Sequence, residues 1–280
     1  MPHRYYAART SVIEVFGSLR LLFDYRGLIY NLAIRDLRLK YKRSTIGVAW
    51  SLLNPLLMML IYTIIFSVFL RTVVTPGRPY WALVLAGLLA WLFFSNSVGS
   101  APVTFVHSGN LVARVSFPIE SLPIASVLAN FVNFLISLAI LLVVLAAIRL
   151  PLGPSLVLLP VILLAQLAFT IGASLLVATL TVYLRDLEHL IGVGLTALFY
   201  LTPVLYPLDP ASLPRGADRI IPYLKLNPLA WFLDSYHAVL FYGVWPSLAQ
   251  FLLMLGAAAL ALVVGYLVFL RLRTRLPEEV

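Results

Sequence analysis

The sequence of 280 residues contains no cysteine and has few charged residues. Without cysteine, no disulfide can join its loops, and no thiolate can serve as a nucleophile or a metal ligand. Only 11% of the residues are charged, whereas a soluble domain has roughly 25%. Hydrophobic residues make up 62% of the chain, and the mean hydropathy is +0.99. This composition excludes an ordinary soluble protein and predicts an all-α integral membrane protein.

The sequence also lacks the common motifs of catalytic and metal-binding proteins. It has no G-x-x-x-x-G-K-[ST] loop for nucleotide phosphates and no nucleophile elbow. Its four histidines, His3, His107, His189 and His237, are far apart and form no H-x-x-x-H pair. Asp234 lies three residues before His237, but a polar helix face toward the outer aqueous phase explains such a pair better than acid–base chemistry. We therefore expect no catalytic residue, metal or cofactor on this chain, and a transport path whose energy comes from another protein.

Long apolar stretches dominate what is present. Between Val48 and Leu70 there is no charged residue, and these 23 residues suffice to cross a hydrocarbon core of about 30 Å at about 1.5 Å per residue. Five later stretches have the same character. The six predicted transmembrane helices are 50–70, 80–105, 123–148, 155–184, 190–206 and 248–270. They form a transmembrane domain over 50–270, followed by a tail at 271–280.

The segment 207–247 is apolar enough in its second half to be mistaken for another crossing, although it carries Asp234 and His237. A crossing there would place the three arginines after position 270 outside. The positive-inside rule favours the opposite side for them. The sequence therefore predicts re-entrant external helices before the last span. With this topology 14 of the 20 basic residues are cytoplasmic, and both termini of this multi-pass protein lie on the cytoplasmic side of the inner membrane.

The first 49 residues are polar and hold nine of the 20 lysines and arginines. An apolar stripe within them recurs at near-helical spacing, at Leu28, Ile29, Leu32, Ala33 and Leu37. The charged residues of the same segment are Arg35, Asp36, Arg38, Lys40, Lys42 and Arg43. This pattern predicts an N-terminal amphipathic interfacial helix on the inner surface, because a solvated basic tail needs no apolar stripe. The net charge of +9 then indicates contact with membrane lipids rather than nucleic acid.

Several motifs follow one another in a recognisable order. The first comprises Arg35-Asp36-Leu37, Lys40-Tyr41-Lys42 and the run from Gly47 to Leu56, GVAWSLLNPL. The later ones are VSFPIESLP at 115–123, YLRDLEHL at 183–190, TPVLYP at 202–207 and LNPL at 226–229. Together they resemble the signatures of the ABC-type polysaccharide export permeases, which export O-antigen, capsule or teichoic acid chains. The resemblance covers roughly 35–240, and Ile119 stands where the family commonly has a basic residue.

The resemblance implies a permease that forms a homodimer and carries two copies of an ABC ATPase subunit. ATP and Mg would bind to that partner subunit, and the substrate would be a lipid-linked polysaccharide. The cytoplasmic connector would couple the permease to the ATPase through Arg114, Phe117, Pro118, Glu120 and Pro123. A second contact, or a brace to the interfacial helix, would involve Arg185, Asp186, Glu188 and His189. The alternative for these residues is a simple charged boundary at the membrane surface.

The chain is rich in aromatic residues, with 16 Phe, 14 Tyr and 5 Trp. Aromatic rings can bind the apolar faces of sugars while letting a chain slide, because stacking tolerates small displacements. Tyr62, Phe66 and Phe69 share one face of the first predicted span, and Phe199, Tyr200 and Tyr206 lie late in the fifth. With the resemblance, these six residues are the predicted substrate path. The alternative is that they pack inside the protein or face lipid.

Two other functions stay open at this point. One is a permease for small molecules, drugs or lipids of the same transporter superfamily. The other is a membrane enzyme acting on polyprenyl-linked sugars, which would need two neighbouring carboxylates to hold a metal. Asp186 and Glu188 are the only near pair on the cytoplasmic side besides the terminal Glu278-Glu279, and Arg185 would compete for them.

Overall fold

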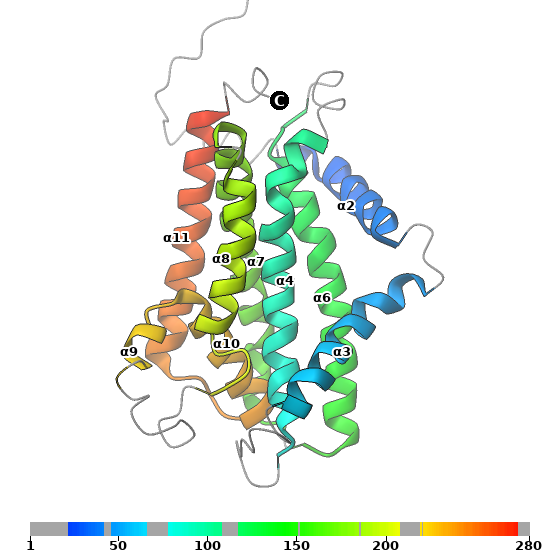
Figure 1. Ribbon diagram of the computed structural model, residues 1–280, viewed down its shortest axis with the longest axis vertical. Helices are drawn as coiled ribbons and strands as arrows, with labels where there is room; N and C mark the ends of the chain where they lie inside the picture. The colour runs from blue at the N-terminus through cyan, green and yellow to red at the C-terminus, as the bar shows by residue number, and fades with distance from the viewer. Residues whose placement is uncertain are drawn as a thin grey trace, which may run out of the picture.

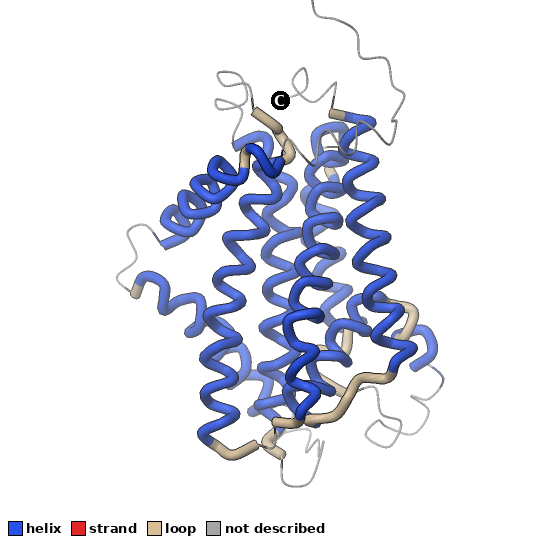
Figure 2. The backbone as a smooth tube through the Cα atoms, turned by 180° about the vertical axis from the view of Figure 1, so that it is seen from behind, coloured by secondary structure: helices blue, strands red, loops and turns tan. Residues whose placement is uncertain are grey.

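The computed structural model describes residues 22–41, 46–65, 78–107, 117–150, 152–184, 186–207, 219 and 221–273. All regular structure in these residues is helical, as Figure 2 shows. The elements in chain order are α2 (Arg26–Tyr41), η1 (Gly47–Ala49), α3 (Trp50–Thr63), α4 (Tyr80–His107), α6 (Ser121–Ala147), η3 (Pro154–Leu158), α7 (Leu159–Tyr183), α8 (Leu187–Leu201), α9 (Ile221–Leu224), α10 (Pro228–Tyr236), η6 (His237–Tyr242) and α11 (Leu248–Leu272). The prediction of an all-helical protein is confirmed over this part of the chain.

Four helices of the described residues are long and apolar enough to cross a membrane. They are Tyr80–Phe105, Ser121–Ala147, Pro154–Tyr183 and Leu248–Leu272, close to the second, third, fourth and sixth predicted spans. The ranges predicted for the first and fifth spans hold shorter apolar helices, α3 and α8. Residues 66–70 of the first predicted span lie outside the described residues. Six crossings therefore stay a prediction, whereas four candidate spans are present.

Helix α4 occupies the middle of the bundle. In Figure 1 the helices α6, α7, α8 and α11 run along the same long axis around it, while α2 and α3 lie obliquely. Most of the α4 span is buried, and it packs against α3, α6, α7 and α8. A buried amide on α7 ties three elements together. Gln166 Nε2 donates to the Ala90 carbonyl of α4 at 2.8 Å, and Gln166 Oε1 accepts from the Tyr236 hydroxyl of α10 at 2.6 Å. Both ends of this amide are satisfied away from water.

Helices α7 and α11 make the most extensive contact in the bundle. Gly172 and Gly265 stand at the point of closest approach, where a Cβ on either glycine would overlap the backbone of the other helix. Small residues let helix backbones approach in this way inside a membrane, where packing rather than water exclusion drives association. The absence of two side chains therefore sets the distance between α7 and α11.

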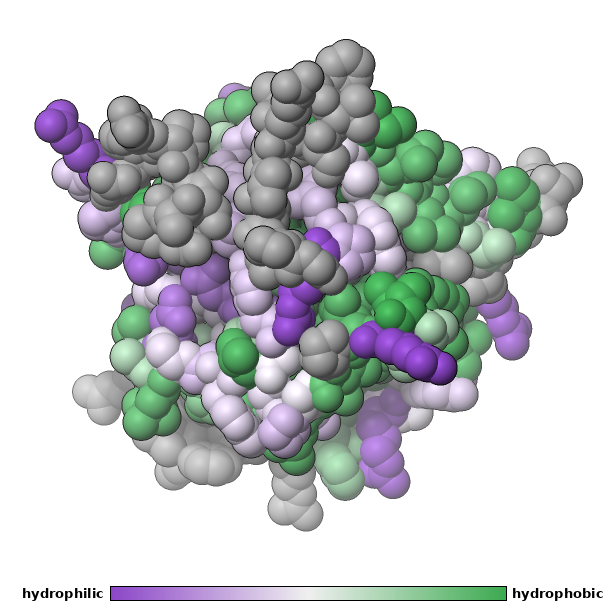
Figure 3. Space-filling model, turned by 90° about the horizontal axis from the view of Figure 1, so that it is seen from below, coloured by the Kyte–Doolittle hydropathy of each residue, from purple (hydrophilic) through white to green (hydrophobic). Residues whose placement is uncertain are grey.

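The segment before α11 forms a bent helical unit at one end of the bundle (Figure 1). Helix α10 continues into the π-helix η6, which ends at Gly243 with φ 64°. Arg78, just before α4, donates to the carbonyls of Phe241 and Tyr242 and so fixes the end of η6. Figure 3 looks onto this end of the molecule, where polar residues are interspersed with hydrophobic patches. The unit lies where re-entrant helices were expected, although its depth in a membrane stays a prediction.

His237 corrects one expectation for this unit. Its side chain is only 2% exposed, so the prediction that it belongs to a water-facing polar surface is wrong. The physical reason is a space left by a glycine of α4, since a Cβ at Gly87 would lie 2.8 Å from His237 Nε2. Burial lowers the pKa of His237 to about 4, and the ring is therefore neutral at ordinary pH. Asp234 does not pair with it and instead accepts from Gln250 Nε2 at 3.2 Å.

A helix, α2, occupies the range in which the amphipathic helix was predicted. Its stripe residues Ile29, Leu32 and Ala33 are buried, and the helix packs against α6. Arg38 and Lys40 are exposed, and the Lys40 ammonium reaches Asn130 of α6. Figure 1 shows α2 beside the end where α6 begins and α11 ends. Lys42 and Arg43 lie outside the described residues. The position of this helix on a membrane surface stays a prediction.

Candidate functional site

An aromatic cluster joins the predicted first and fifth spans. The Tyr62 ring of α3 lies 5.7 Å from the Phe199 ring of α8, between centroids. Phe199 also lies 5.6 Å from Trp91 of α4 and 5.2 Å from its neighbour Tyr200. The Tyr206 hydroxyl donates to the Tyr200 carbonyl at 2.8 Å. Four of the six predicted path residues are thus brought together, and we call these four with Trp91 the aromatic cluster.

The cluster is graded from a buried to an exposed side. Trp91 is 5% exposed, Tyr62 and Phe199 are half-buried, and Tyr200 is 64% exposed. Phe66 and Phe69, the other two predicted path residues, lie outside the described residues. Trp91 was missed because its contact with Phe199 joins residues more than a hundred positions apart, which no local pattern reveals. Buried Trp91 therefore packs against Phe199, while one face of the Tyr200 ring stays exposed.

Helix α8 carries this free face, and none of its residues is buried. Its exposed apolar side chains include Leu190, Val193, Tyr200 and Leu201. Its apolar surface must be covered by lipid or by protein, because water at such a surface is unfavourable. The cluster can offer stacking surfaces and hydroxyl groups. Within the described ranges, no group of three or more His, Asp or Glu side chains could hold a metal ion.

The predicted coupling segment forms a turn at the opposite end of the bundle from η6. Pro118, Glu120 and Pro123 are buried, while Phe117 is half-buried. The Ser121 hydroxyl donates to the Pro118 carbonyl at 2.6 Å and closes the turn. Arg114, the fifth predicted coupling residue, lies outside the described residues. The structure therefore places three of these residues inside the turn rather than on its surface.

Glu120 faces a charged residue near the end of the chain. A cavity of about 310 Å³ is lined by Tyr25, Phe117, Pro118, Ile119, Glu120, Phe269 and Arg273. Glu120 is only 3% exposed, and the pKa of its carboxyl is raised, because burial outweighs the opposing effects of a backbone hydrogen bond and of the Arg273 charge. A carboxylate removed from water needs such a cation to stay charged. The start of α6 and the end of α11 are thus coupled electrostatically.

The second predicted contact region lies at the same end of the molecule. Asp186, Glu188 and His189 are exposed at the start of α8, and the Tyr183 hydroxyl at the end of α7 donates to the Leu272 carbonyl of α11 at 2.8 Å. Arg185 lies outside the described residues. Asp186 and Glu188 stand on the surface of one helix end, where they are available to a partner.

Two of the sequence motifs meet each other. Asn227 precedes α10 and caps it, because its Oδ1 accepts from the Leu229 backbone at 3.0 Å. Its Nδ2 donates to the Thr202 hydroxyl at 2.8 Å, just after α8 ends. The motifs TPVLYP and LNPL therefore form one junction that ties the start of α10 to the segment just after α8.

Comparisons with known proteins agree with this architecture. The family described as ABC-2 type transporter matches residues 27–241. An O-antigen export system permease protein RfbA from Myxococcus xanthus is 36% identical over 244 residues, which cover 87% of this chain and 91% of that protein. Two proteins of the same name from Klebsiella pneumoniae are 30% and 31% identical over 267 and 264 residues, covering 95% and 93% of this chain and 98% and 96% of theirs. The chain belongs to the ABC-2 type transporter family.

Proposed function

We propose that this chain is the membrane-spanning permease subunit of an ATP-driven exporter of a lipid-linked, O-antigen-like polysaccharide. The observation that carries the proposal is its similarity, over nearly the whole chain, to three O-antigen export permeases. Two copies of the chain would associate with two ATPase subunits in the cytoplasmic membrane. ATP and Mg would bind only to those partners, and both ends of this chain would face the cytoplasm.

The aromatic cluster supports the substrate path. A polysaccharide must slide past the protein, so its binding surface has to hold sugar rings without fixing one register. Tyr62 and Tyr200 offer ring faces and hydroxyl groups, while Trp91 supports them from the core. Because α8 buries no side chain within this chain, a second copy placed against it would enclose the cluster. The path in the dimer would then be lined by α3 and α8.

The end surface that carries Phe117 and Glu188 supports the ATPase contact. Exposed Asp186, Glu188 and His189 would meet the partner directly. Buried Pro118, Glu120 and Pro123 would act differently, by holding the turn in shape and linking it to α11 through Arg273. A displacement of this turn would move both α6, which continues directly from it, and α11, whose Phe269 and Arg273 line the same cavity.

Deletion and complementation test the proposed function. A strain lacking the chain should lose its surface polysaccharide and accumulate lipid-linked glycan inside, and the intact gene should restore the surface polymer. Export would be read by labelling the surface glycan, and intracellular glycan by extraction and gel analysis. Normal surface polysaccharide in the deleted strain, with no glycan retained inside, would contradict the proposal.

A further inference from the structure

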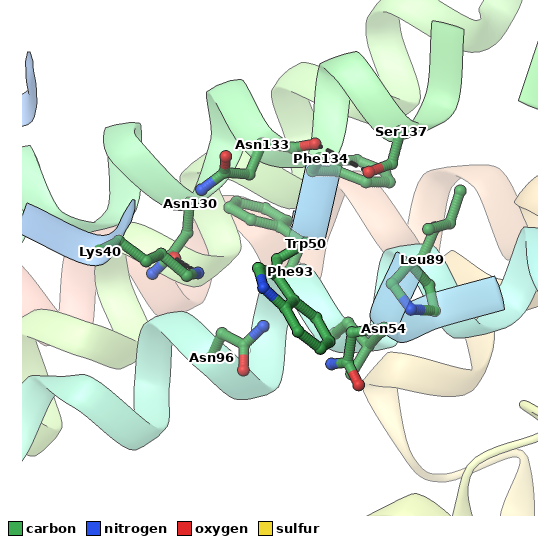
Figure 4. Close-up of a pocket in the computed structure, with 12 residues that line it drawn as sticks. Lys40, Trp50, Asn54, Leu89, Phe93, Asn96, Asn130, Asn133, Phe134 and Ser137 are labelled. Carbon is green, nitrogen blue, oxygen red and sulfur yellow. Dashed lines mark hydrogen bonds between the residues drawn. The ribbon is translucent and has the colours of Figure 1, made fainter. Parts of the chain in front are cut away.

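A polar lane lies between α2, α3, α4 and α6. Two adjoining hollows of about 310 and 550 Å³ share Lys40, Asn96 and Asn130 in their walls. Figure 4 shows these three side chains around one space, with Trp50 and Asn54 of α3 on its far side. The lane begins beside α2 and reaches the middle of α4 and α6.

The lane walls are two polar stripes at helical spacing. Helix α4 contributes Asn96, Ser100 and Thr104, and α6 contributes Ser126, Asn130, Asn133 and Ser137. Residues four and three apart lie on one helix face. Both helices are candidate membrane spans, and side chains of this kind are costly against hydrocarbon unless they find polar partners. The hydroxyls of Ser100, Thr104 and Ser137 are satisfied within their own helices, because each donates to a backbone carbonyl three or four residues earlier.

Contacts between the helices satisfy only part of this polarity. The Ser100 and Ser126 hydroxyls lie 3.4 Å apart, which is a bond within the protein. Asn96 differs, because the residue is exposed, lines both hollows and makes no hydrogen bond with the described residues. An amide has two donors and an acceptor oxygen. The donors and the acceptor of the Asn96 amide are therefore free to bind a ligand in the lane.

The charge at the open end of the lane is positive. Lys40 Nζ donates to Asn130 Oδ1 at 3.2 Å, whereas Arg35 is neutralised by Asp36 at 3.0 Å. Among the described residues, Lys40 has no carboxylate within ion-pair distance. Partial burial lowers the pKa of the Lys40 ammonium, although the residue as a whole is exposed. The same helix α6 exposes Val132, Leu135 and Ile136, so an apolar surface adjoins the polar lane.

We propose that this lane binds the phosphate-bearing head group of an anionic membrane lipid. Lys40 contacts the phosphate, Asn96 and Asn130 bind the hydroxyl groups beside it, and the hydrocarbon chain lies along the exposed apolar residues of α6. The lipid has two possible sources, the carrier of the exported glycan and a phospholipid of the leaflet next to α2. The first source rests on the proposed function, whereas the binding chemistry does not.

Native mass spectrometry of the delipidated full-length chain tests this proposal. The chain would be titrated with a polyprenyl pyrophosphate disaccharide, with phosphatidylglycerol, and with a glucosyl diacylglycerol that has no phosphate. The variants are Lys40→Gln, Asn96→Leu and Asn130→Leu. The matched controls are Arg38→Gln, which removes a charge from the same helix outside the lane, and Asn31→Leu on the exposed side of α2. Gel filtration and circular dichroism identify any variant that does not fold.

We expect phosphate lipids to bind and the phosphate-free glycolipid not to bind. Lys40→Gln should weaken binding about tenfold, the change expected for one lost charge-assisted hydrogen bond. The controls should change it less than about twofold, because a solvent-exposed charge contributes little. Preference for the polyprenyl lipid identifies the glycan carrier as the ligand, and equal binding or a preference for phosphatidylglycerol identifies a leaflet phospholipid.

Two results would overturn the proposal. One is undiminished binding in folded Lys40→Gln and Asn130→Leu variants. The other is an equal loss in Arg38→Gln, since the attraction would then be general surface charge. Neither result bears on the export function, which deletion and complementation measure separately. The experiments therefore distinguish an error in the proposed lipid site from an error in the proposed export function.

Discussion

At the residue scale, Gly172 and Gly265 have a larger effect on the bundle than their size indicates. They stand opposite one another where α7 and α11 touch, and neither helix has room there for a methyl group. By contrast, Gly192 of α8 has nothing within 4 Å of an added Cβ. Gly172 and Gly265 therefore cannot be replaced by a larger residue without a shift of the backbone, whereas Gly192 can.

Replacing Gly172 by alanine should destabilise the protein by about 1–3 kcal/mol, the usual cost of overpacking a tight core. The measurement is the unfolding midpoint in detergent, followed by fluorescence-detected gel filtration. Gly192→Ala is the control, and it should leave the midpoint unchanged or raise it slightly, because alanine favours the helix. Equal midpoints for Gly172→Ala and the parent chain would show that α7 and α11 are less tightly packed than described.

The capping residue Asn227 offers a second test at this scale. Asn227→Ala removes the cap of α10 and the bond to Thr202, and should cost about 1–2 kcal/mol. Asn227→Asp keeps an acceptor for the cap but loses the donor, so its loss should be smaller. The unfolding midpoint again gives the readout. A larger loss for aspartate than for alanine would contradict the capping role.

Sequence reasoning reached some residues and not others. It selected Tyr62 and Phe199 from helical spacing and from the family resemblance, and their rings are in contact. It missed Trp91 and predicted that His237 faces water. Both side chains contact residues distant in the chain. The free space beside Gly87 that buries His237 has no signature in local sequence.

At the element scale, hydropathy and length located the long helices well. The ranges of α4, α6, α7 and α11 follow from apolar runs bounded by charges and prolines. Helices α3 and α8 were less predictable, since they are shorter and bury less of their surface within one chain. Elements completed by a partner or by lipid leave a weaker pattern than those completed by their own chain.

The ring contact between Tyr62 of α3 and Phe199 of α8 leads to a prediction about transport. Tyr62→Ala and Phe199→Ala should each reduce glycan export several-fold while leaving assembly with the ATPase intact, because they remove ring faces and not the helices. Tyr62→Phe should retain most of the activity if stacking dominates. Tyr223→Ala, in α9 and away from the cluster, is the control. Surface glycan labelling measures the effect, and full export in both alanine variants would exclude the path.

The unit formed by α10 and η6 should respond to pH through two groups of opposite sign. Burial lowers the pKa of His237 to about 4 and raises that of Asp234 to about 6. As pH falls from about 6.5 to about 4, the unfolded histidine gains a proton that the folded one does not, and stability is lost. As pH rises from about 4 to about 6, the unfolded Asp234 loses a proton that the folded one keeps, which also lowers stability.

These two effects oppose one another in the parent chain, so single variants should reveal each. Asp234→Asn should make the unfolding midpoint fall more steeply between pH 6.5 and pH 4.5 than in the parent. His237→Gln should make it rise over the same interval. Unfolding midpoints at several pH values provide the data. Parallel profiles for all three proteins would show that neither group is buried as described.

At the scale of the whole molecule, membership of the ABC-2 type transporter family implies an ATPase partner for this chain. The chain has the membrane helices and an aromatic cluster with a free face, while a P-loop is absent from its sequence. Family membership followed from the order of several motifs, and the comparisons bear it out. The proposed assembly of two permeases and two ATPases lies beyond what a single sequence encodes, because the dimer surface is not a local pattern.

Affinity purification through a tag at the C-terminus tests the central claim most directly. The native membrane would be solubilised in a mild detergent that keeps other ABC transporters intact, and the co-eluting proteins identified and quantified by mass spectrometry. The account predicts a P-loop ATPase recovered in equal amount with this chain, in a particle that holds two copies of each. Recovery of this chain without any ATPase, under conditions that preserve a control transporter, would contradict it.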